Sequence, residues 1–212
     1  MKSNILTTKF KTILGFLLLG VAFPLAAQDE QPKVPLINLN ALAQLEVIGK
    51  FQVTGEIVYI YKIDEVTAAA KNIDDFAENV AHYLQRFTAE NGFEACALIA
   101  KSPGENLWGA TLITIGSNTA CPKTSAAPKG MRSTGIDIHS HVPTTKFNPN
   151  AIDKLFLARK YGRYEMVSTL PELFSPSDFE AGEGYMVSSA TLWYQNGIGT
   201  TRVIKIMPLL EK

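Results

Sequence analysis

Clustered apolar residues predict strands in several parts of the chain. Residues 51–63 are dense in valine, isoleucine, phenylalanine and tyrosine, with Gly55 in the middle, which predicts a strand pair or one bulged strand. Residues 93–100 and 107–115 flank the turn sequence Pro103-Gly104-Glu105-Asn106 and predict a β-hairpin. Three further strands are predicted at residues 185–189, 192–195 and 200–207, the last two joined through Asn196-Gly197.

Helical periodicity appears in two places. Residues 72–90 carry apolar side chains three or four positions apart and end at Asn91-Gly92, which predicts a long helix. His82 lies at the edge of its apolar stripe, so we expect it to be partly exposed. Residues 150–160 predict a second helix with Asn150 as its cap. A short helix is predicted to begin at Ser175.

The strand predicted at residues 135–141 has two different faces. Side chains alternate along a strand, so Ile136 and Ile138 face one side, and Asp137, His139 and His141 face the other. Residues 121–134 are rich in proline, lysine, serine and threonine and are expected to form an exposed loop. Strands and helices follow one another without a regular βαβ rhythm. This pattern predicts an α/β (α+β) fold with a mixed β-sheet flanked by helices.

The first 27 residues have the pattern of an export signal. Three lysines precede an apolar run at residues 13–23, and small residues up to Ala27 offer a cleavage site. The run is short for a membrane span, so a signal peptide at 1–27 is the favoured interpretation, with an uncleaved anchor as the alternative. Residues 28–40 then predict a linker, and residues 41–212 a single domain.

The charge and the cysteine content of the chain limit the compartments and the classes of partner that we expect for it. The chain has 20 basic and 20 acidic residues, and cleavage of the signal removes three lysines, so the net charge of the mature protein is −3. A mildly acidic chain without a basic run binds nucleic acid poorly, so we do not expect nucleic acid as a partner. Cys96 and Cys121 predict either one disulfide, as expected for a periplasmic or secreted protein, or two buried free thiols. No Cys-x-x-Cys spacing is present.

His139-Ser140-His141 and the later Asp178 are candidate metal ligands. Two imidazoles on one strand face, with a carboxylate from another element, would form an open zinc site. Hydrolysis at such a site also needs a base, for which Glu94 is a candidate, and an oxyanion donor, for which Ser175 is a candidate. Structural explanations also exist. The histidine pair can belong to a solvent-facing strand edge, and Ser175-Pro176-Ser177-Asp178 makes a good helix start.

Taken together, these motifs resemble the JAMM (JAB1/MPN) metalloprotease family. Its signature is an upstream glutamate, then His-x-His-Pro, then Ser-x-x-Asp. The resemblance covers roughly residues 74–207, and the matching stretches are Phe93-Glu94-Ala95-Cys96, Ile138-His139-Ser140-His141 and Phe174-Ser175-Pro176-Ser177-Asp178-Phe179, followed by Gly184-Tyr185-Met186-Val187-Ser188. The resemblance implies a JAMM/MPN-like (cytidine-deaminase-like) architecture.

By this resemblance, each motif residue has a role. The resemblance implies that His139, His141 and Asp178 bind zinc. It implies that Glu94 is the general base for the attacking water and that Ser175 helps to hold the oxyanion. Glu90 and Glu105 lie nearby in the sequence and remain alternatives for the base.

The chain departs from the family pattern in two places. Val142 stands where the family has proline, with Pro143 one residue later. The stretch between His141 and Ser175 is also long and contains the predicted helix at residues 150–160. This insertion is compatible with a lid, with a wall that selects the substrate, or with a domain that has lost catalysis.

Two functional hypotheses follow. The first is an exported zinc-dependent peptidase that hydrolyses an amide or isopeptide bond. Its substrate would be a peptide or protein, and cell-wall peptides are one candidate on grounds of location. The alternative is a non-catalytic JAMM-like module that binds a protein partner in the periplasm, of the immunity or chaperone type.

Overall fold

The computed structural model describes residues 39–124, 126–144, 146–161, 167–168 and 172–208. The predicted signal peptide and most of the linker lie outside these residues. Helix α1 (Leu39–Leu42) begins within the last two positions of the predicted linker. Within the described part of the chain, no helix is long and apolar enough to cross a membrane.

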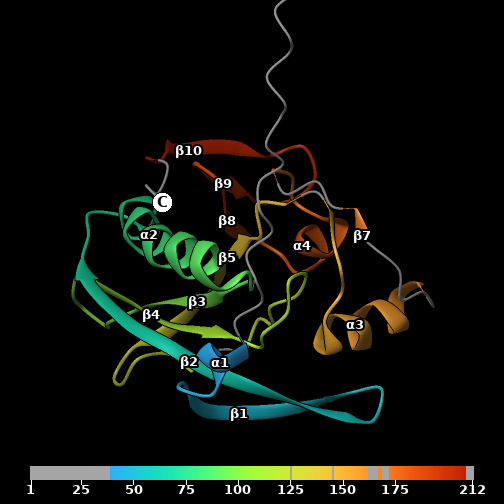
Figure 1. Ribbon diagram of the computed structural model, residues 1–212. Coiled ribbons are helices and arrows are strands. Elements are labelled where there is room, and N and C mark those ends of the chain that lie inside the picture. The colour runs from blue at the N-terminus through green and yellow to red at the C-terminus, as the bar shows by residue number, and fades with distance from the viewer. Residues whose placement is uncertain (1–38, 125, 145, 162–166, 169–171, 209–212) are drawn as a thin grey trace, which may run out of the picture. The chain divides into compact units, whose positions relative to one another are not determined.

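A mixed sheet of eight described strands forms the centre of the fold, in the order β1-β2-β4-β3-β5-β8-β9-β10 (Figure 1). The β5–β8 pair is parallel, and the other pairs in this sheet are antiparallel. The predicted mixed sheet is therefore confirmed. The strands are β1 (Glu46–Val53), β2 (Glu56–Ala69), β3 (Cys96–Lys101), β4 (Leu107–Thr114), β5 (Arg132–His141), β8 (Gly184–Ser188), β9 (Thr191–Gln195) and β10 (Arg202–Ile206). A small second sheet pairs β6 (Lys146–Phe147) with β7 (Val167–Ser168).

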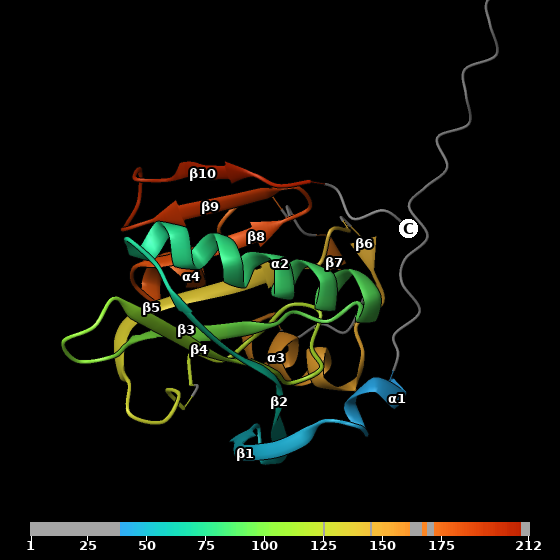
Figure 2. The same ribbon diagram turned by 90° about the vertical axis from the view of Figure 1, so that its left-hand side faces the viewer.

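Helix α2 (Ile73–Asn91) covers one face of the sheet, whereas α3 (Ala151–Tyr161) and α4 (Pro176–Glu180) lie on the other side (Figures 1 and 2). The Asn72 side chain caps the start of α2, and Gly92 ends it in the left-handed conformation, with φ of 73°. The apolar stripe of α2 packs against strand residues that include Ile99, Ile138 and Tyr185. This packing forms the larger part of the core and confirms the predicted helix.

A second apolar cluster lies on the opposite face, beneath α3. It contains Val58, Cys96 and Ile113, and partly buried side chains of α3 pack against it. Cys96 and Cys121 form a disulfide with their Cα atoms 5.9 Å apart. The disulfide prediction is therefore confirmed, and the alternative of two free thiols is wrong.

Several element boundaries differ from those predicted. The strands expected at residues 51–63 extend further and form the β1–β2 hairpin, whose two-residue turn has positive φ at both Thr54 (52°) and Gly55 (91°). Strand β5 begins at Arg132, inside the predicted loop. Gly135, expected to begin the strand, lies within it instead, where its φ of 82° accompanies an irregular register against β3.

The parallel β5–β8 pair determines where α4 lies. Parallel neighbours require a crossover connection, because the chain must return to the starting edge of the sheet. Here the crossover from β5 to β8 contains β6, α3, β7 and α4. Its last helix, α4, reaches the face of β5 that α2 does not cover.

Candidate metal centre

Strand β5 presents both histidines of the motif on the face opposite α2. Ile138 and Ser140 face α2, where Ile138 is fully buried in the core and Ser140 Oγ lies 2.6 Å from Thr88 Oγ1 of the helix. His139 and His141 therefore face the other side, as the alternation predicts. Their ring centroids are 5.0 Å apart.

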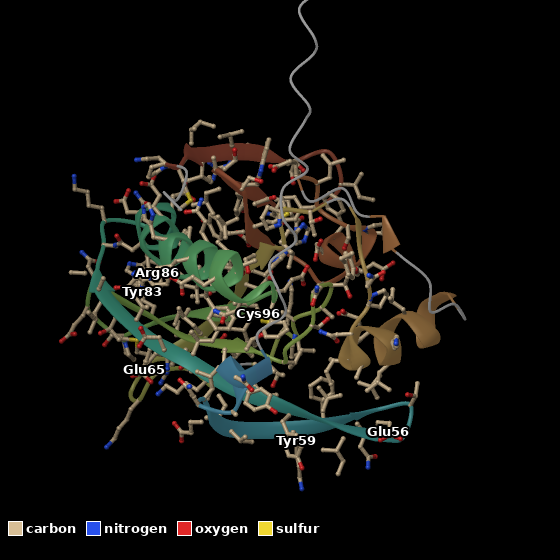
Figure 3. The ribbon with its side chains drawn as sticks, in the orientation of Figure 1. Glu56, Tyr59, Glu65, Tyr83, Arg86 and Cys96 are labelled. Atoms are coloured by element: carbon tan, nitrogen blue, oxygen red, sulfur yellow. A yellow bond between two sulfur atoms is a disulfide. The ribbon has the colours of Figure 1, made fainter. Side chains whose placement is uncertain are left out.

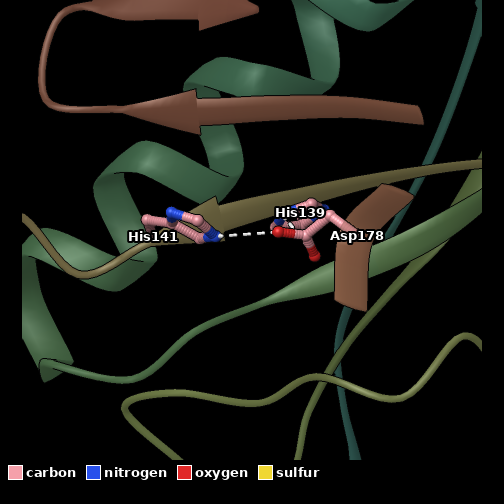
Figure 4. Close-up of side chains that lie close together, drawn as sticks. All are labelled: His139, His141 and Asp178. Atoms are coloured by element: carbon pink, nitrogen blue, oxygen red, sulfur yellow. Dashed lines mark ion pairs between the residues drawn. The ribbon is translucent and has the colours of Figure 1, made fainter. Parts of the chain in front are cut away.

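Helix α4 supplies the carboxylate of the cluster. Asp178 Oδ1 lies 3.6 Å from His139 Nε2, and Asp178 Oδ2 lies 3.8 Å from His141 Nε2 (Figure 4). The three ligand atoms all lie within 4.8 Å of one another. The backbone N–H of Ser175, the N-cap residue, donates to Asp178 Oδ2 at 2.6 Å, so the start of the helix fixes this carboxylate.

The donor set and its burial fit a metal ion. His139 is only 6% exposed, and its Nε2 is a buried nitrogen without a hydrogen-bond partner among the described residues. A buried polar atom without a partner is costly, and coordination would satisfy it. Two imidazoles and one carboxylate are a donor set of catalytic zinc sites, although other transition metals also use it. His139, His141 and Asp178 could therefore hold a metal ion.

Asp137 holds the opposite side of the His139 ring. Its Oδ2 lies 3.0 Å from His139 Nδ1, and its Oδ1 forms an ion pair of 2.5 Å with Lys123 Nζ. Burial lowers the pKa of His139, but the hydrogen bond to Asp137 and the charge of Asp178 outweigh burial, so the net pKa is raised above its usual value. The sequence placed Asp137 on the histidine face without giving it a role.

Glu94 is buried just before β3, at the end of the sheet where His141 lies. Its carbonyl accepts a hydrogen bond from Thr114 Oγ1, and Ser140 donates to the next carbonyl, that of Ala95. The hydrogen bond from the backbone N–H of Ser140 to Ala95 O continues the β3–β5 register one residue beyond the Cys96–His139 pair, and Glu94 precedes Ala95. Burial, then the negative charges of Asp178 and Asp153, raise the pKa of Glu94 well above its usual value. The Glu94 carboxyl is thus close enough to Asp178 to be affected by its charge.

Other candidate residues lie away from the cluster. Glu90 belongs to α2, on the other face of the sheet, and lines a pocket there with Tyr83 and Arg86. Figure 3 labels Tyr83 and Arg86 beside this helix. Glu105 is exposed in the turn at the far end of the β3–β4 hairpin, and His82 is exposed on α2 as expected. Of the three glutamates considered for the base, Glu94 is therefore the one positioned near the metal ligands.

Ser175 is half-buried at the start of α4. Its hydroxyl lies 2.8 Å from the Ser177 hydroxyl. It contacts Asp178 through its backbone N–H, which donates to Asp178 Oδ2, and through the capping box at the start of α4, which also includes the Ser175 side chain. The oxyanion role of Ser175 stays a prediction.

The sequence analysis did not identify two residues of the site. Lys123 lies in the loop that was expected to be merely exposed, and no local pattern links it to Asp137. Gly184 stands at the first position of β8, directly beside Asp137 in the parallel register. A glycine at a strand end commonly marks a close approach, so its presence was the one available hint.

Comparison of the chain with protein families, curated proteins and solved structures found no match. The resemblance to the JAMM family therefore rests on the motif residues of this sequence.

Proposed function

We propose that this protein is a zinc-dependent peptidase of JAMM type that hydrolyses an amide or isopeptide bond. The observation that carries the proposal is the convergence of the ligand atoms of His139, His141 and Asp178 within 4.8 Å of one another, together with a buried Glu94 whose pKa the charge of Asp178 helps to raise. A zinc ion held there would polarise an amide carbonyl and lower the pKa of a coordinated water to about 7.

The chain's own residues supply the remaining chemistry. Burial and the charges of Asp178 and Asp153 raise the pKa of Glu94 well above its usual value, so this carboxyl binds a proton more tightly than an exposed glutamate does. In the proposed reaction, Glu94 accepts the proton of the attacking water and passes it to the leaving amine. Ser175 is proposed to donate its hydroxyl hydrogen to the developing oxyanion.

Metal analysis and hydrolysis assays test this proposal together. Protein purified without a histidine tag should contain about one zinc per chain. His139→Ala and Asp178→Ala should lose the zinc, because each removes one of the three proposed ligands. Glu94→Gln should keep the zinc and lose most hydrolysis of a peptide library, by at least about a hundredfold, because general base catalysis contributes that much.

Asp75→Ala is the control for these variants, since Asp75 is an exposed acid on the far side of the sheet. It should leave zinc content and hydrolysis unchanged. Absence of zinc from wild-type protein, with normal folding of the ligand variants, would exclude the proposed enzyme.

The second candidate function is a metal-stabilised module that binds a protein partner. The exposed apolar side chains of the β1–β2 hairpin favour it: Val47 is 52% exposed, Ile57 is 47% exposed, and Tyr59, which Figure 3 labels, is 45% exposed. Zinc bound at full stoichiometry, with no hydrolysis of any peptide or cell-wall fragment by the wild-type protein, would support this candidate instead.

An oxidising compartment outside the cytoplasm is the proposed location. The Cys96–Cys121 disulfide supports it, because structural disulfides persist in such compartments. A periplasmic or secreted site would make peptides of the cell wall, or other exported proteins, the accessible substrates.

A further inference from the structure

We infer that Asp137 is a positioning residue for the metal: it holds His139 in the tautomer whose bare Nε2 faces Asp178 and His141. This inference rests on the proposed metal site. Asp137 is 3% exposed, and its Oδ2 lies 3.0 Å from His139 Nδ1. An anionic acceptor at Nδ1 keeps the ring proton there, so Nε2 carries a lone pair.

The second carboxylate oxygen of Asp137 is fixed as well. Lys123 Nζ lies 2.5 Å from Asp137 Oδ1 and donates a further hydrogen bond to Ala181 O at 3.0 Å. With both oxygens engaged, the carboxylate cannot rotate away from His139. Lys123 also compensates the charge of Asp137, which would be costly to bury alone.

Gly184 provides the space that this carboxylate occupies. Asp137 and Gly184 are direct partners in the parallel β5–β8 register, so their side-chain positions adjoin on one face. A Cβ atom built on Gly184 would overlap Asp137 Oδ1. The backbone of Gly184 is not in the left-handed region. Its lack of a side chain is therefore needed for the Asp137 carboxylate rather than for a turn.

The position of the ring proton gives a direct test. The chain has three histidines, so nitrogen-15 NMR of the zinc-free protein at pH 8 resolves each imidazole, and one variant assigns His139. Wild-type protein should show the His139 proton on Nδ1. Asp137→Ala should move a substantial share of it to Nε2 and weaken zinc binding, measured by chelator competition, by about 10- to 100-fold.

Gly184→Ala tests the same contact without altering Asp137. The new methyl group displaces the carboxylate, so it should shift the tautomer in the same direction and weaken zinc binding by about tenfold or more. Asp74→Ala is the matched control. Like Asp137, Asp74 contacts both a cation and a ring side chain: it forms an ion pair with Arg202 and accepts a hydrogen bond from the Tyr185 hydroxyl. These contacts lie on the α2 side of the sheet. It should change neither readout, whatever it does to stability.

The two proposals fail in different ways. An unchanged His139 tautomer and unchanged zinc affinity in both Asp137→Ala and Gly184→Ala would overturn the role of Asp137, and zinc-dependent hydrolysis would stand. Wild-type protein that binds no zinc would overturn the proposed function, and the NMR measurement would still decide whether Asp137 sets the tautomer. A tautomer shift in the Asp74→Ala control would also count against the inference.

Discussion

Asp178 combines two interactions in one carboxylate. It accepts the backbone N–H of Ser175 at the start of α4, and it faces both imidazoles. Burial alone would raise the pKa of Asp178, but His139, His141 and the hydrogen bonds from Ser175 outweigh burial and lower it. The carboxylate is therefore ionised and already oriented before a metal arrives.

Zinc binding should weaken in mild acid, because protons compete for the imidazole nitrogens. The pKa of His139 is raised above its usual value, so this competition begins at a higher pH than for an ordinary histidine. Zinc affinity should be constant above this pKa and fall by at least about tenfold for each further pH unit below it. Chelator competition between pH 8 and pH 5.5 measures this. A flat profile would contradict imidazole coordination.

The motif that contains Asp178 shows which structural questions the sequence could decide and which it could not. From Ser175-Pro176-Ser177-Asp178 alone, a helix cap and a metal ligand are alternatives. The two are compatible in space, since the oxygen that accepts the N–H of Ser175 still faces His141. Their compatibility depends on where α4 packs against β5, and such a long-range contact leaves no local pattern.

At the level of elements, α3 is held to the sheet by a buried acid at its first turn. Asp153 is fully buried and accepts hydrogen bonds from Ser117 Oγ at 2.6 Å, from the backbone N–H of Asn118 at 2.7 Å and from the backbone N–H of Asn150 at 2.9 Å. Asn150 Oδ1 in turn caps the helix by accepting the N–H of Asp153. Helix α3 is therefore anchored to the loop that follows β4, and its first turn is fixed in place.

Asp153→Ala should lower the free energy of unfolding by about 3 kcal/mol, because several donors lose a charged acceptor inside the protein. Urea denaturation measures this change. Asp75→Ala is the matched control: Asp75 occupies the same third position of its helix, α2, but is exposed. Its effect should stay below about 0.5 kcal/mol. Equal losses in the two variants would show that Asp153 does not anchor α3.

Local patterns predicted the elements better than their arrangement. The apolar spacing of α2, the Asn150 cap and the alternation across His139 all depend on neighbours in sequence, and each is confirmed. The strand order and the pairing of β5 with β8 depend on contacts between distant residues. The Lys123–Asp137 ion pair belongs to the second group, because it forms only when the loop after Cys121 folds over β5.

For the molecule as a whole, the disulfide joins the sheet to the loop that carries Lys123. Cys96 pairs with His139 across β3 and β5, and Lys123 follows Cys121 by two positions. The covalent link therefore holds the lysine near Asp137. It also closes a loop between residues 25 positions apart, which limits the freedom of the unfolded chain.

Replacing both cysteines by alanine should lower the free energy of unfolding by about 3 kcal/mol, from loop closure. Denaturation of the double variant beside the wild type measures this loss. Mass spectrometry without reductant should find the peptides of Cys96 and Cys121 joined. Two alkylatable thiols in the untreated protein, or equal stability of the double variant, would contradict the expectation.

The parallel pairing of β5 with β8 also sets an order in time. In folding, the two histidines are already neighbours on β5, whereas Asp178 lies near the end of the crossover. The full set exists only after the crossover has returned to the sheet, and long-range parallel pairing is slow to form. A metal bound there would stabilise one of the last regions of the protein to assemble.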